Sequence, residues 1–296
     1  MKIDRYRWTD EEKRNILNTL LSDPAILPEK KEAPRLISMS ETISEAISRF
    51  RTGKKQLVGV SSGYESLDRL TQCFAPGELI VIFGHTSHGK SQLAQNIACN
   101  VAMTGQAVLI ISMEMSKAEN TGRLMQIFGF TGEQIDMSGK ANQFVQLPII
   151  YPDSKEIQAD DVDGIVAAAV AEGAKIAIID HLHYFSRGGD EVAEIGSLVN
   201  RFKQIAVQRD IPILLISHIV KLDESIRPKK HHLRGSSYIA QDADMLISVY
   251  RDPDNEQWGL QINIHKNRNR GFDPADSGIT LAIEDNVRLI ELKPLT

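Results

Sequence analysis

The sequence feature that most constrains the fold is residues 79–91, which read LIVIFGHTSHGKS. The first five residues are apolar and mostly β-branched, which is typical of a strand buried on both faces of a parallel sheet. The rest matches the GxxxxGK[ST] spacing of a P-loop. Glycines let backbone amides approach a phosphate closely, and the helix that follows directs its positive end at the same anion. The predicted nucleotide-binding residues are Gly84, His85, Thr86, Ser87, His88, Gly89, Lys90 and Ser91.

Two side chains of this loop have expected roles. Lys90 should reach the outer phosphates of ATP, and the Ser91 hydroxyl should ligate Mg2+. The alternative is a glycine-rich turn that binds no nucleotide. However, apolar residues recur at helical spacing from Leu93 to Val101 and Gly105 ends the run, so an amphipathic helix should follow. A strand, a P-loop and a helix in this order favour the nucleotide site.

Composition limits the classes of protein that this chain can belong to. Its 296 residues, 42% of them hydrophobic, suffice for one large α/β domain with a small appendage. No apolar run approaches the roughly 20 residues that cross a bilayer, and the N-terminus is charged, so we expect a soluble cytoplasmic protein. The two cysteines lack the spacing of a zinc site or a disulfide framework.

The charge balance bears on nucleic-acid binding. A net charge of −5 argues against coating of nucleic acid by bulk attraction, so any such contact must be local. The candidate is the segment 221–234, which has five Lys or Arg residues against two acids.

Apolar runs and turn signals place the other elements. Helices should alternate with strands over most of the chain, which predicts a mainly parallel sheet with both faces covered. The last strands leave no room for helices, so the sheet should end in antiparallel hairpins. The expected strands are 79–83, 107–112, 149–151, 175–180, 211–217, 245–250, 260–265, 279–283 and 287–292.

Three parts are expected along the chain. Residues 1–39 should form a short N-terminal helical segment and a linker, and residues 40–56 should contain a helix with a narrow apolar stripe. Such a helix is not stable alone, so it must dock on its own body or on a neighbouring subunit. The α/β core should occupy residues 57–296.

Two acids and a histidine follow predicted strands, and the carboxyl ends of parallel strands share one edge of a sheet. Asp180 ends KIAIID as a Walker B acid would, holding Mg2+ with Ser91; the alternative is a strand-end cap. Glu114 should orient and deprotonate the attacking water unless it is a solvated loop carboxylate. His218 should contact the γ-phosphate unless it is a packed or solvated histidine.

Alternating cations occur in the segment IHKNRNRG at 264–271. Lys266, Arg268 and Arg270 would share one face of an extended chain. If that face meets the nucleotide of an adjacent subunit, one or two of them act as arginine fingers. The alternative is a solvated edge strand whose cations prevent aggregation.

Seven segments taken together resemble one family: VGVSSGYESLDRL, GHTSHGKS, IISMEM, AIIDHLHYF, ILLISHI, LRGSSYIAQDADMLISVYRD and IHKNRNRG. They are similar to the RecA-fold ATPase domain of DnaB-type hexameric replicative helicases, over roughly residues 40–292. The resemblance implies a RecA-like P-loop fold at 57–296, a homohexameric ring, ATP and Mg2+ between subunits, and single-stranded DNA in the central channel. It also implies that residues 40–56 pack on the next subunit.

The resemblance also assigns roles to residues. It makes Glu114 the catalytic base, His218 a sensor, and Lys266 with Arg268 the basic pair that acts on the neighbouring subunit; Arg270 has no clear counterpart. It places DNA contacts in the loops after Asp180 and His218. The matching basic residues there are Arg187, Arg227, Lys229, Lys230 and Arg234.

The hypothesis is an ATP-dependent DNA helicase or translocase that works as a ring. A primase or a helicase loader is a possible partner, although only about forty residues precede the helix at 40–56, where family members commonly carry a large primase-binding domain. The alternatives are a RecA/RadA-like recombinase, a KaiC-like ATPase, or a nucleotide-gated loader that does not unwind DNA.

Overall fold

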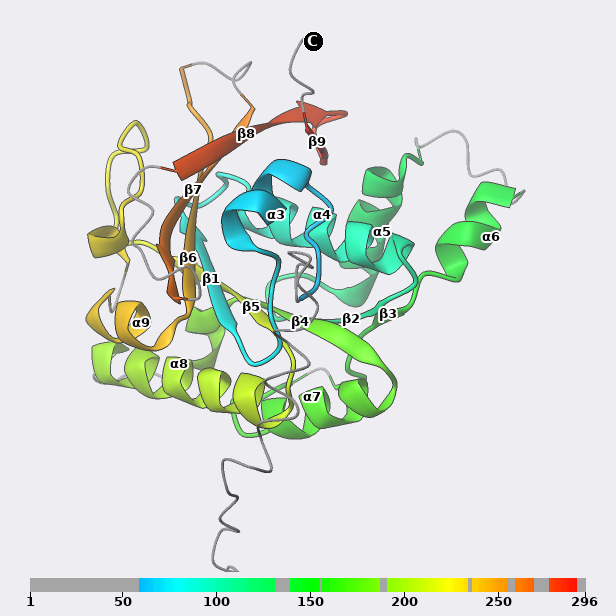
Figure 1. Cartoon of the computed structure of the whole chain (residues 1–296), viewed down its shortest axis with the longest axis horizontal. Helices are drawn as coiled ribbons and strands as arrows, with labels where there is room; N and C mark the ends of the chain where they lie inside the picture. The colour runs from blue at the N-terminus through cyan, green and yellow to red at the C-terminus, as the bar shows by residue number, and fades with distance from the viewer. Residues whose placement is uncertain are drawn as a thin grey trace, which may run out of the picture. The chain divides into compact units, whose positions relative to one another are not determined.

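The computed structural model describes residues 59–130, 139–154, 156–186, 191–233, 236–254, 259–268 and 277–291. Helices and strands carry the labels of Figure 1. The segments predicted at 1–39 and 40–56 lie outside the described residues.

One nine-stranded sheet forms the centre of the described fold, in the order β3-β2-β4-β5-β1-β6-β7-β8-β9. The first six strands of this order pair in parallel, and the last three pair antiparallel. The prediction of a mainly parallel sheet that ends in antiparallel hairpins is therefore confirmed. The strands are β1 (Leu79–Gly84), β2 (Ala107–Ser112), β3 (Ile149–Ile150), β4 (Ala174–Asp180), β5 (Ile213–His218), β6 (Met245–Tyr250), β7 (Leu260–Asn267), β8 (Ser277–Glu284) and β9 (Arg288–Glu291).

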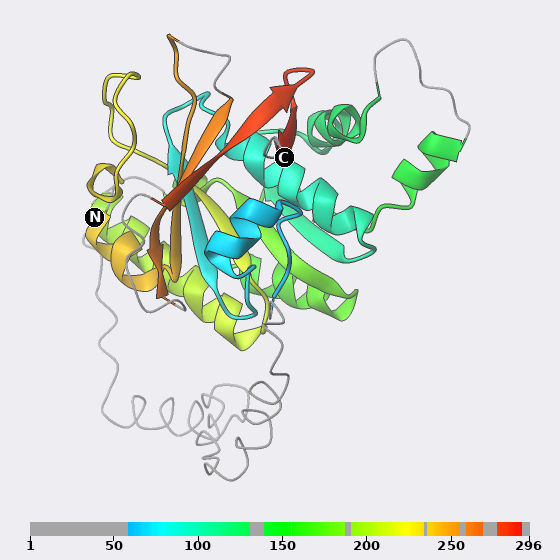
Figure 2. The same ribbon diagram turned by 45° about the horizontal axis from the view of Figure 1, so that its top comes forward.

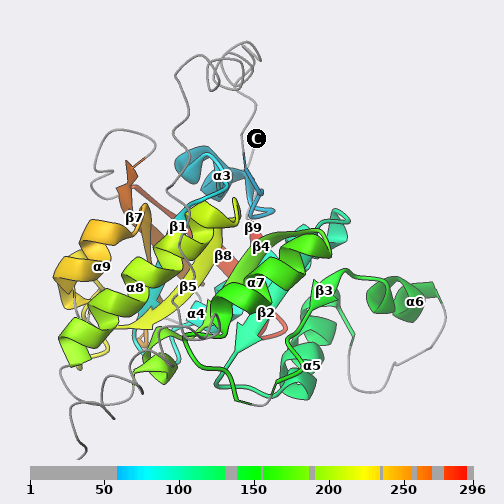
Figure 3. The same ribbon diagram turned by 90° about the horizontal axis from the view of Figure 1, so that it is seen from below.

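Helices cover both faces of this sheet (Figures 1 and 3). One face packs on α3 (Glu65–Thr71), α4 (Lys90–Met103) and α5 (Lys117–Phe128), and the other packs on α7 (Val162–Ala171), α8 (Glu191–Gln208) and α9 (Ser236–Asp242). The shorter elements are α6 (Gly139–Val145) and the 3-10 helices η1 (Leu182–Phe185) and η2 (Lys230–His232). In the part of the chain that the structure describes, no helix is long and apolar enough to cross a membrane.

The two cores follow from the alternation of side chains along each strand. In β1, Ile80 and Ile82 join the core under α4, while Leu79, Val81 and Phe83 join the core under α8. All six residues of β1 are buried, as predicted for a strand covered on both faces.

Helical spacing predicted most of the buried face of each long helix. The apolar positions of α4 from Leu93 to Val101 are buried, and so are Ile195, Val199 and Phe202 of α8. Val192 continues the helical spacing of these residues but is 47% exposed. Spacing gives the face of a helix on which a residue lies, and it does not tell whether anything covers that face at the first turn.

Strand direction decides which loops meet. In the register of the sheet Gly84 lies opposite His218, and Ser112 lies opposite Asp180. The P-loop, the loop that holds Glu114, and the ends of β4 and β5 therefore share the carboxyl edge, as predicted. Strand β7 runs the other way and ends beside the start of β6, so its last residues lie at the opposite edge.

Helix α5 begins with a capping box. The amide of Glu119 donates to the Ser116 hydroxyl at 3.2 Å, and the amide of Ser116 donates to the Glu119 carboxylate at 2.8 Å. Ser116→Ala should lower the free energy of unfolding by about 0.5–2 kcal/mol, as measured by urea denaturation. Ser116→Thr keeps a hydroxyl cap and should lose less; equal losses in the two variants would contradict the capping role.

Candidate active site

A cavity of about 330 Å³ opens at the carboxyl edge of the sheet, above the P-loop. It brings together Lys90, Ser91, Glu114, Asp180 and His218, which come from four separate segments of the sequence. The complete lining is Thr86, Ser87, Gly89, Lys90, Ser91, Gln92, Glu114, Met115, Arg123, Asp180, His181, Ile216 and His218.

The backbone of the P-loop is shaped to receive an anion. Gly89 has φ 90° and Ser87 has φ 63°, both in the left-handed region. A Cβ on Gly84 would lie 2.5 Å from the carbonyl oxygen of Val249, so only glycine fits there. Within the described residues, the amides of Thr86, Ser87 and Gly89 have no hydrogen-bond acceptor. Together with the N-terminus of α4, which starts at Lys90, these amides form a cradle for phosphate.

Lys90 places a buried cation in this cradle. Its ammonium donates to the carbonyl oxygens of Gly84 at 3.2 Å and of His85 at 2.7 Å. Burial lowers the pKa of Lys90 to about 8, while the carboxylates of Asp180 and Glu114 act in the opposite direction. Since this pKa lies above 7, Lys90 remains mostly charged at neutral pH.

Asp180 and Ser91 fit a bound Mg2+. Burial raises the pKa of Asp180, opposed by a hydrogen bond from the Ser91 hydroxyl. The Oδ1 atom of Asp180 is buried and has no hydrogen-bond partner among the described residues. A hard cation beside Ser91 would satisfy that oxygen. The described residues contain no group of three or more Asp, Glu, His or Cys that could hold a metal. A metal at Asp180 and Ser91 would take other ligands from phosphate or water.

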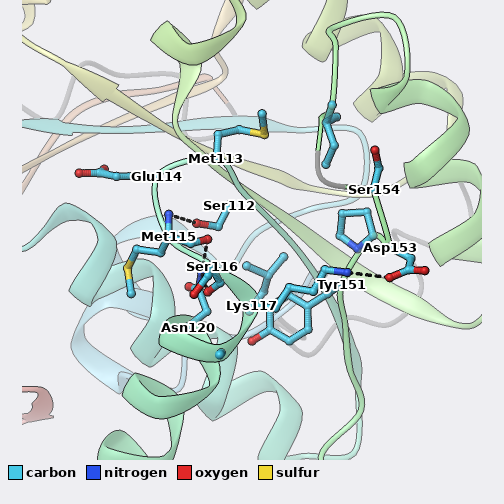
Figure 4. A pocket seen from close by; sticks show the side chains of 14 residues that line it. Ser112, Met113, Glu114, Met115, Ser116, Lys117, Asn120, Tyr151, Asp153 and Ser154 are labelled. Atoms are coloured by element: carbon cyan, nitrogen blue, oxygen red, sulfur yellow. Dashed lines mark hydrogen bonds and ion pairs between the residues drawn. The ribbon is translucent and has the colours of Figure 1, made fainter.

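Glu114 stands between two cavities. Its side chain is 53% exposed, and its Oε2 lies 4.0 Å from Nε2 of His181. It also lines a second cavity of about 600 Å³, which residues near the start of α5 and the end of β3 enclose. In Figure 4, which views this second cavity, the Glu114 side chain extends away from the ion pair between Lys117 and Asp153. The carboxylate is therefore accessible from the nucleotide side.

His181 was not predicted as a site residue. It follows Asp180, lines the nucleotide cavity, and packs edge-to-face on His218 with ring centroids 4.3 Å apart. Burial, and then the charge of Lys90, lowers the pKa of His181 to about 4, so its ring is neutral at pH 7. Its position at the end of a strand, next to a Walker B acid, was the available signal.

Arg123 was also missed. It lies on α5, is exposed, and lines the nucleotide cavity. The sequence carries no signal for it, because its position depends on how α5 crosses the sheet.

Two of the predicted P-loop residues face elsewhere. His85 and His88 are 5% and 6% exposed, and neither lines the nucleotide cavity. Their predicted part in nucleotide binding is through the backbone of the loop and stays a prediction, while their side chains contact other parts of the protein.

Lys266 and Arg268 do not line the nucleotide cavity of their own chain. The Lys266 ammonium donates to the carbonyl oxygens of Ala240 at 2.6 Å and Ala243 at 2.5 Å. Arg268 contacts the Asp244 carboxylate at 3.2 Å and the Gln241 carbonyl at 2.8 Å. Both cations thus face the end of α9, as predicted for alternating residues. Strand β7 pairs with β6 along its length but with β8 only from Leu260 to Ile264, so the edge-strand alternative for the cations at 266–268 stays open.

The predicted DNA-binding residues are only partly described. Arg227, Lys229 and Lys230 are exposed on the loop that follows β5, and a bridge between Ile219 and Leu233 closes the base of this loop. It projects beside α9, in yellow, in Figure 2. The other predicted cations, Arg187, Arg234 and Arg270, lie outside the described residues.

Replicative DNA helicases are similar to this chain in sequence. The chain is 28% identical over 226 residues to a probable replicative DNA helicase of Trieres chinensis, an alignment that covers 69% of this chain and 50% of that protein. It is 27% identical over 249 residues to the replicative DNA helicase DnaC of Bacillus subtilis, covering 75% and 55%. The chain therefore spans about half the length of the curated relatives that it matches.

Solved structures agree on the fold. An isolated ATPase domain superposes with a TM-score of 0.75 at 21% identity, covering 88% of this chain and 100% of that domain. A DnaB-like replicative helicase, solved in a study of its interactions with primase, superposes with a TM-score of 0.71 at 19% identity, covering 96% and 76%. The RadB recombinase superposes with a lower TM-score of 0.54 at 18% identity, covering 79% and 100%. At these identities the likeness shows the RecA-like fold alone.

A family profile gives the assignment. The profile described as DnaB-like helicase C terminal domain matches residues 59–277, most of the chain and all the segments that line the cavity. This chain therefore belongs to the DnaB-like helicase C-terminal domain family.

Proposed function

We propose that this chain is the motor of an ATP-dependent replicative DNA helicase that works as a homohexameric ring on single-stranded DNA. The observation that carries the proposal is the single cavity in which Lys90, Ser91, Glu114, Asp180 and His218 meet. That set supplies a phosphate cradle, a metal site, a general base and a candidate sensor, which is what nucleoside triphosphate hydrolysis needs.

The roles of the residues follow from their environment. The free amides of the P-loop and the Lys90 ammonium bind the outer phosphates, while Ser91 and Asp180 hold Mg2+. The metal, when bound, neutralises charge on the phosphate oxygens. Glu114 accepts the proton of the attacking water, since its carboxylate faces the cavity and has solvent access.

The ring supplies the remaining charges. Because Lys266 and Arg268 lie at the other edge of the sheet from their own P-loop, they are suited to act on the nucleotide of a neighbouring copy. A hexamer whose interfaces each hold one nucleotide is an arrangement of this kind.

Partners follow from the family and the charge pattern. Single-stranded DNA is the proposed substrate of the exposed basic loop after β5. A primase or a helicase loader is a further proposed partner, in keeping with the primase interactions described for a structural relative. We place the protein in the cytoplasm, where such partners act.

One pair of measurements tests the proposal. Light scattering with and without ATP and single-stranded DNA should show a ring, and a forked duplex should be unwound in an ATP-dependent reaction. Strand exchange with ATP but without hydrolysis would instead indicate a recombinase. Hydrolysis that neither single-stranded DNA nor Glu114→Gln changes would indicate a nucleotide-gated loader. A chain that stays monomeric and binds no adenine nucleotide would contradict all three.

The basic loop gives a prediction that does not involve turnover. Reversing Lys229 and Lys230 to Glu should weaken binding of single-stranded DNA and flatten its salt dependence, because each phosphate contact contributes about 0.7 to the log–log slope. Fluorescence anisotropy over a series of salt concentrations measures both. Lys175→Glu, an exposed lysine at the start of β4, is the control. An unchanged slope in the double variant would remove this loop from the DNA-contact surface.

A further inference from the structure

Neither P-loop histidine lines the nucleotide cavity, and His85 contacts the basic loop after β5. Nε2 of His85 lies 2.8 Å from the carbonyl oxygen of Ile226. A carbonyl only accepts, so Nε2 carries the proton and donates it. The side chain of His85 thus connects the phosphate-binding loop to the middle of the basic loop through one hydrogen bond.

A second contact lies beside the first. The Tyr250 hydroxyl, at the end of β6, donates to the carbonyl oxygen of Ser225 at 3.0 Å. The ring of Tyr250 packs against His88 of the P-loop, with centroids 5.5 Å apart, and the guanidinium of Arg227 lies 5.8 Å from the centroid of the same ring.

The backbone next to Tyr250 is also tied to the P-loop. The amide of Arg251 donates to Nδ1 of His88 at 3.3 Å. Burial lowers the pKa of His88, in agreement with a neutral ring whose Nδ1 accepts. Ile226 of the basic loop is therefore held by His85 of the P-loop. The adjacent Ser225 is held by Tyr250, which packs on His88 of the P-loop.

The P-loop side of this contact includes a hydrogen bond for which a bound phosphate would compete. The His85 carbonyl oxygen accepts a hydrogen bond from the Lys90 ammonium at 2.7 Å. A phosphate is a charged and stronger acceptor, so it competes for that ammonium and releases the His85 backbone. The imidazole of His85 transmits any such adjustment to Ile226, only one residue from Arg227.

We propose that His85 and Tyr250 are positioning residues that couple the occupancy of the P-loop to the presentation of Arg227, Lys229 and Lys230. This contact is separate from His218, which lies on the cavity wall at the end of β5. The inference rests on the proposed function and deepens it. It gives a contact within one protomer through which bound nucleotide would change how the basic loop binds single-stranded DNA.

The experiment uses trypsin on the full chain, with and without saturating Mg2+ and a non-hydrolysable ATP analogue. Cleavage after Lys221, Lys229 and Lys230 reports the basic loop, and fluorescence titration measures nucleotide affinity independently. In the wild type the analogue should change the cleavage rate at least about threefold. Tyr250→Phe removes one hydroxyl and keeps the ring, and it should at least halve this response at full occupancy. Tyr238→Phe, an exposed tyrosine of α9, should keep the response.

A second pair of variants tests the histidine. His85→Ala should abolish the response at saturating nucleotide, and His85→Gln, which keeps a donor, should restore part of it. A wild type that binds the analogue without any change in cleavage overturns the inference and leaves the proposed ATPase intact. If the analogue changes the cleavage rate of Tyr250→Phe and His85→Ala as much as that of the wild type, the inference is likewise overturned and the proposed ATPase stands. A wild type that binds no nucleotide overturns both.

Discussion

Glu114→Gln should reduce ATP turnover about 10²–10⁴-fold and leave nucleotide affinity within a few-fold of the wild type. The amide keeps the size and polarity of the side chain but accepts no proton from water. Because Glu114 is half-exposed and its carboxylate lies 4.0 Å from His181, beyond hydrogen-bond distance, the substitution should not lower stability. Steady-state phosphate release and equilibrium binding of a fluorescent nucleotide measure the two quantities.

A carboxylate in the second cavity provides the matched control for this variant. Asp153 is exposed and pairs with Lys117 at 2.9 Å, on the side of the second cavity away from the P-loop. Asp153→Asn makes the same chemical change and should keep turnover close to that of the wild type. Glu114→Gln turning over at the wild-type rate would exclude Glu114 as the base.

Arg268→Ala should lower turnover about 10³–10⁵-fold in the assembled protein, the range measured for arginine fingers. Nucleotide binding by a single protomer should not change, because Arg268 does not line that protomer's cavity. The variant should fold, since the Asp244 carboxylate keeps Lys203 at 2.6 Å and the amide of Leu79 at 2.8 Å. Turnover measured above the concentration at which the ring forms gives the result.

Mixing two variants tests whether Arg268 acts on the neighbouring copy. An Arg268→Ala chain retains Glu114, and a Glu114→Gln chain retains Arg268, so about a quarter of the interfaces in an equal random mixture are complete. The mixture should recover activity that neither variant has alone. No recovery would show that the arginine acts within its own chain. Arg209→Ala, which breaks an ion pair with Asp163 of α7, should leave turnover unchanged.

The sequence predicted what depends on local order and on strand direction. Buried strands such as β1 are marked by uninterrupted apolar residues, and long helices by apolar residues at helical spacing. Because parallel strands share a carboxyl edge, the meeting of Lys90, Glu114, Asp180 and His218 followed from the motifs alone.

What the sequence did not predict depends on contacts across space. Arg123 reaches the cavity because of the path that α5 takes over the sheet. His181 lines the cavity with its ring packed against His218. His85 and His88 belong to the P-loop pattern, but His85 contacts the basic loop and His88 packs on Tyr250, because a motif specifies the backbone of such a turn and not the neighbours of every side chain.

The pairing of Asp244 in this structure has a consequence for how rings of this protein would form. This carboxylate is almost completely buried and is shared by Lys203, Arg268 and the first amide of β1. In a protomer without neighbours the guanidinium of Arg268 is therefore compensated. If Arg268 acts on a triphosphate in the next copy, as proposed, it would trade one anion for another, and Lys203 would remain to balance the carboxylate left behind. Closing the ring in this way would complete the active site without stranding a charge in the protein interior.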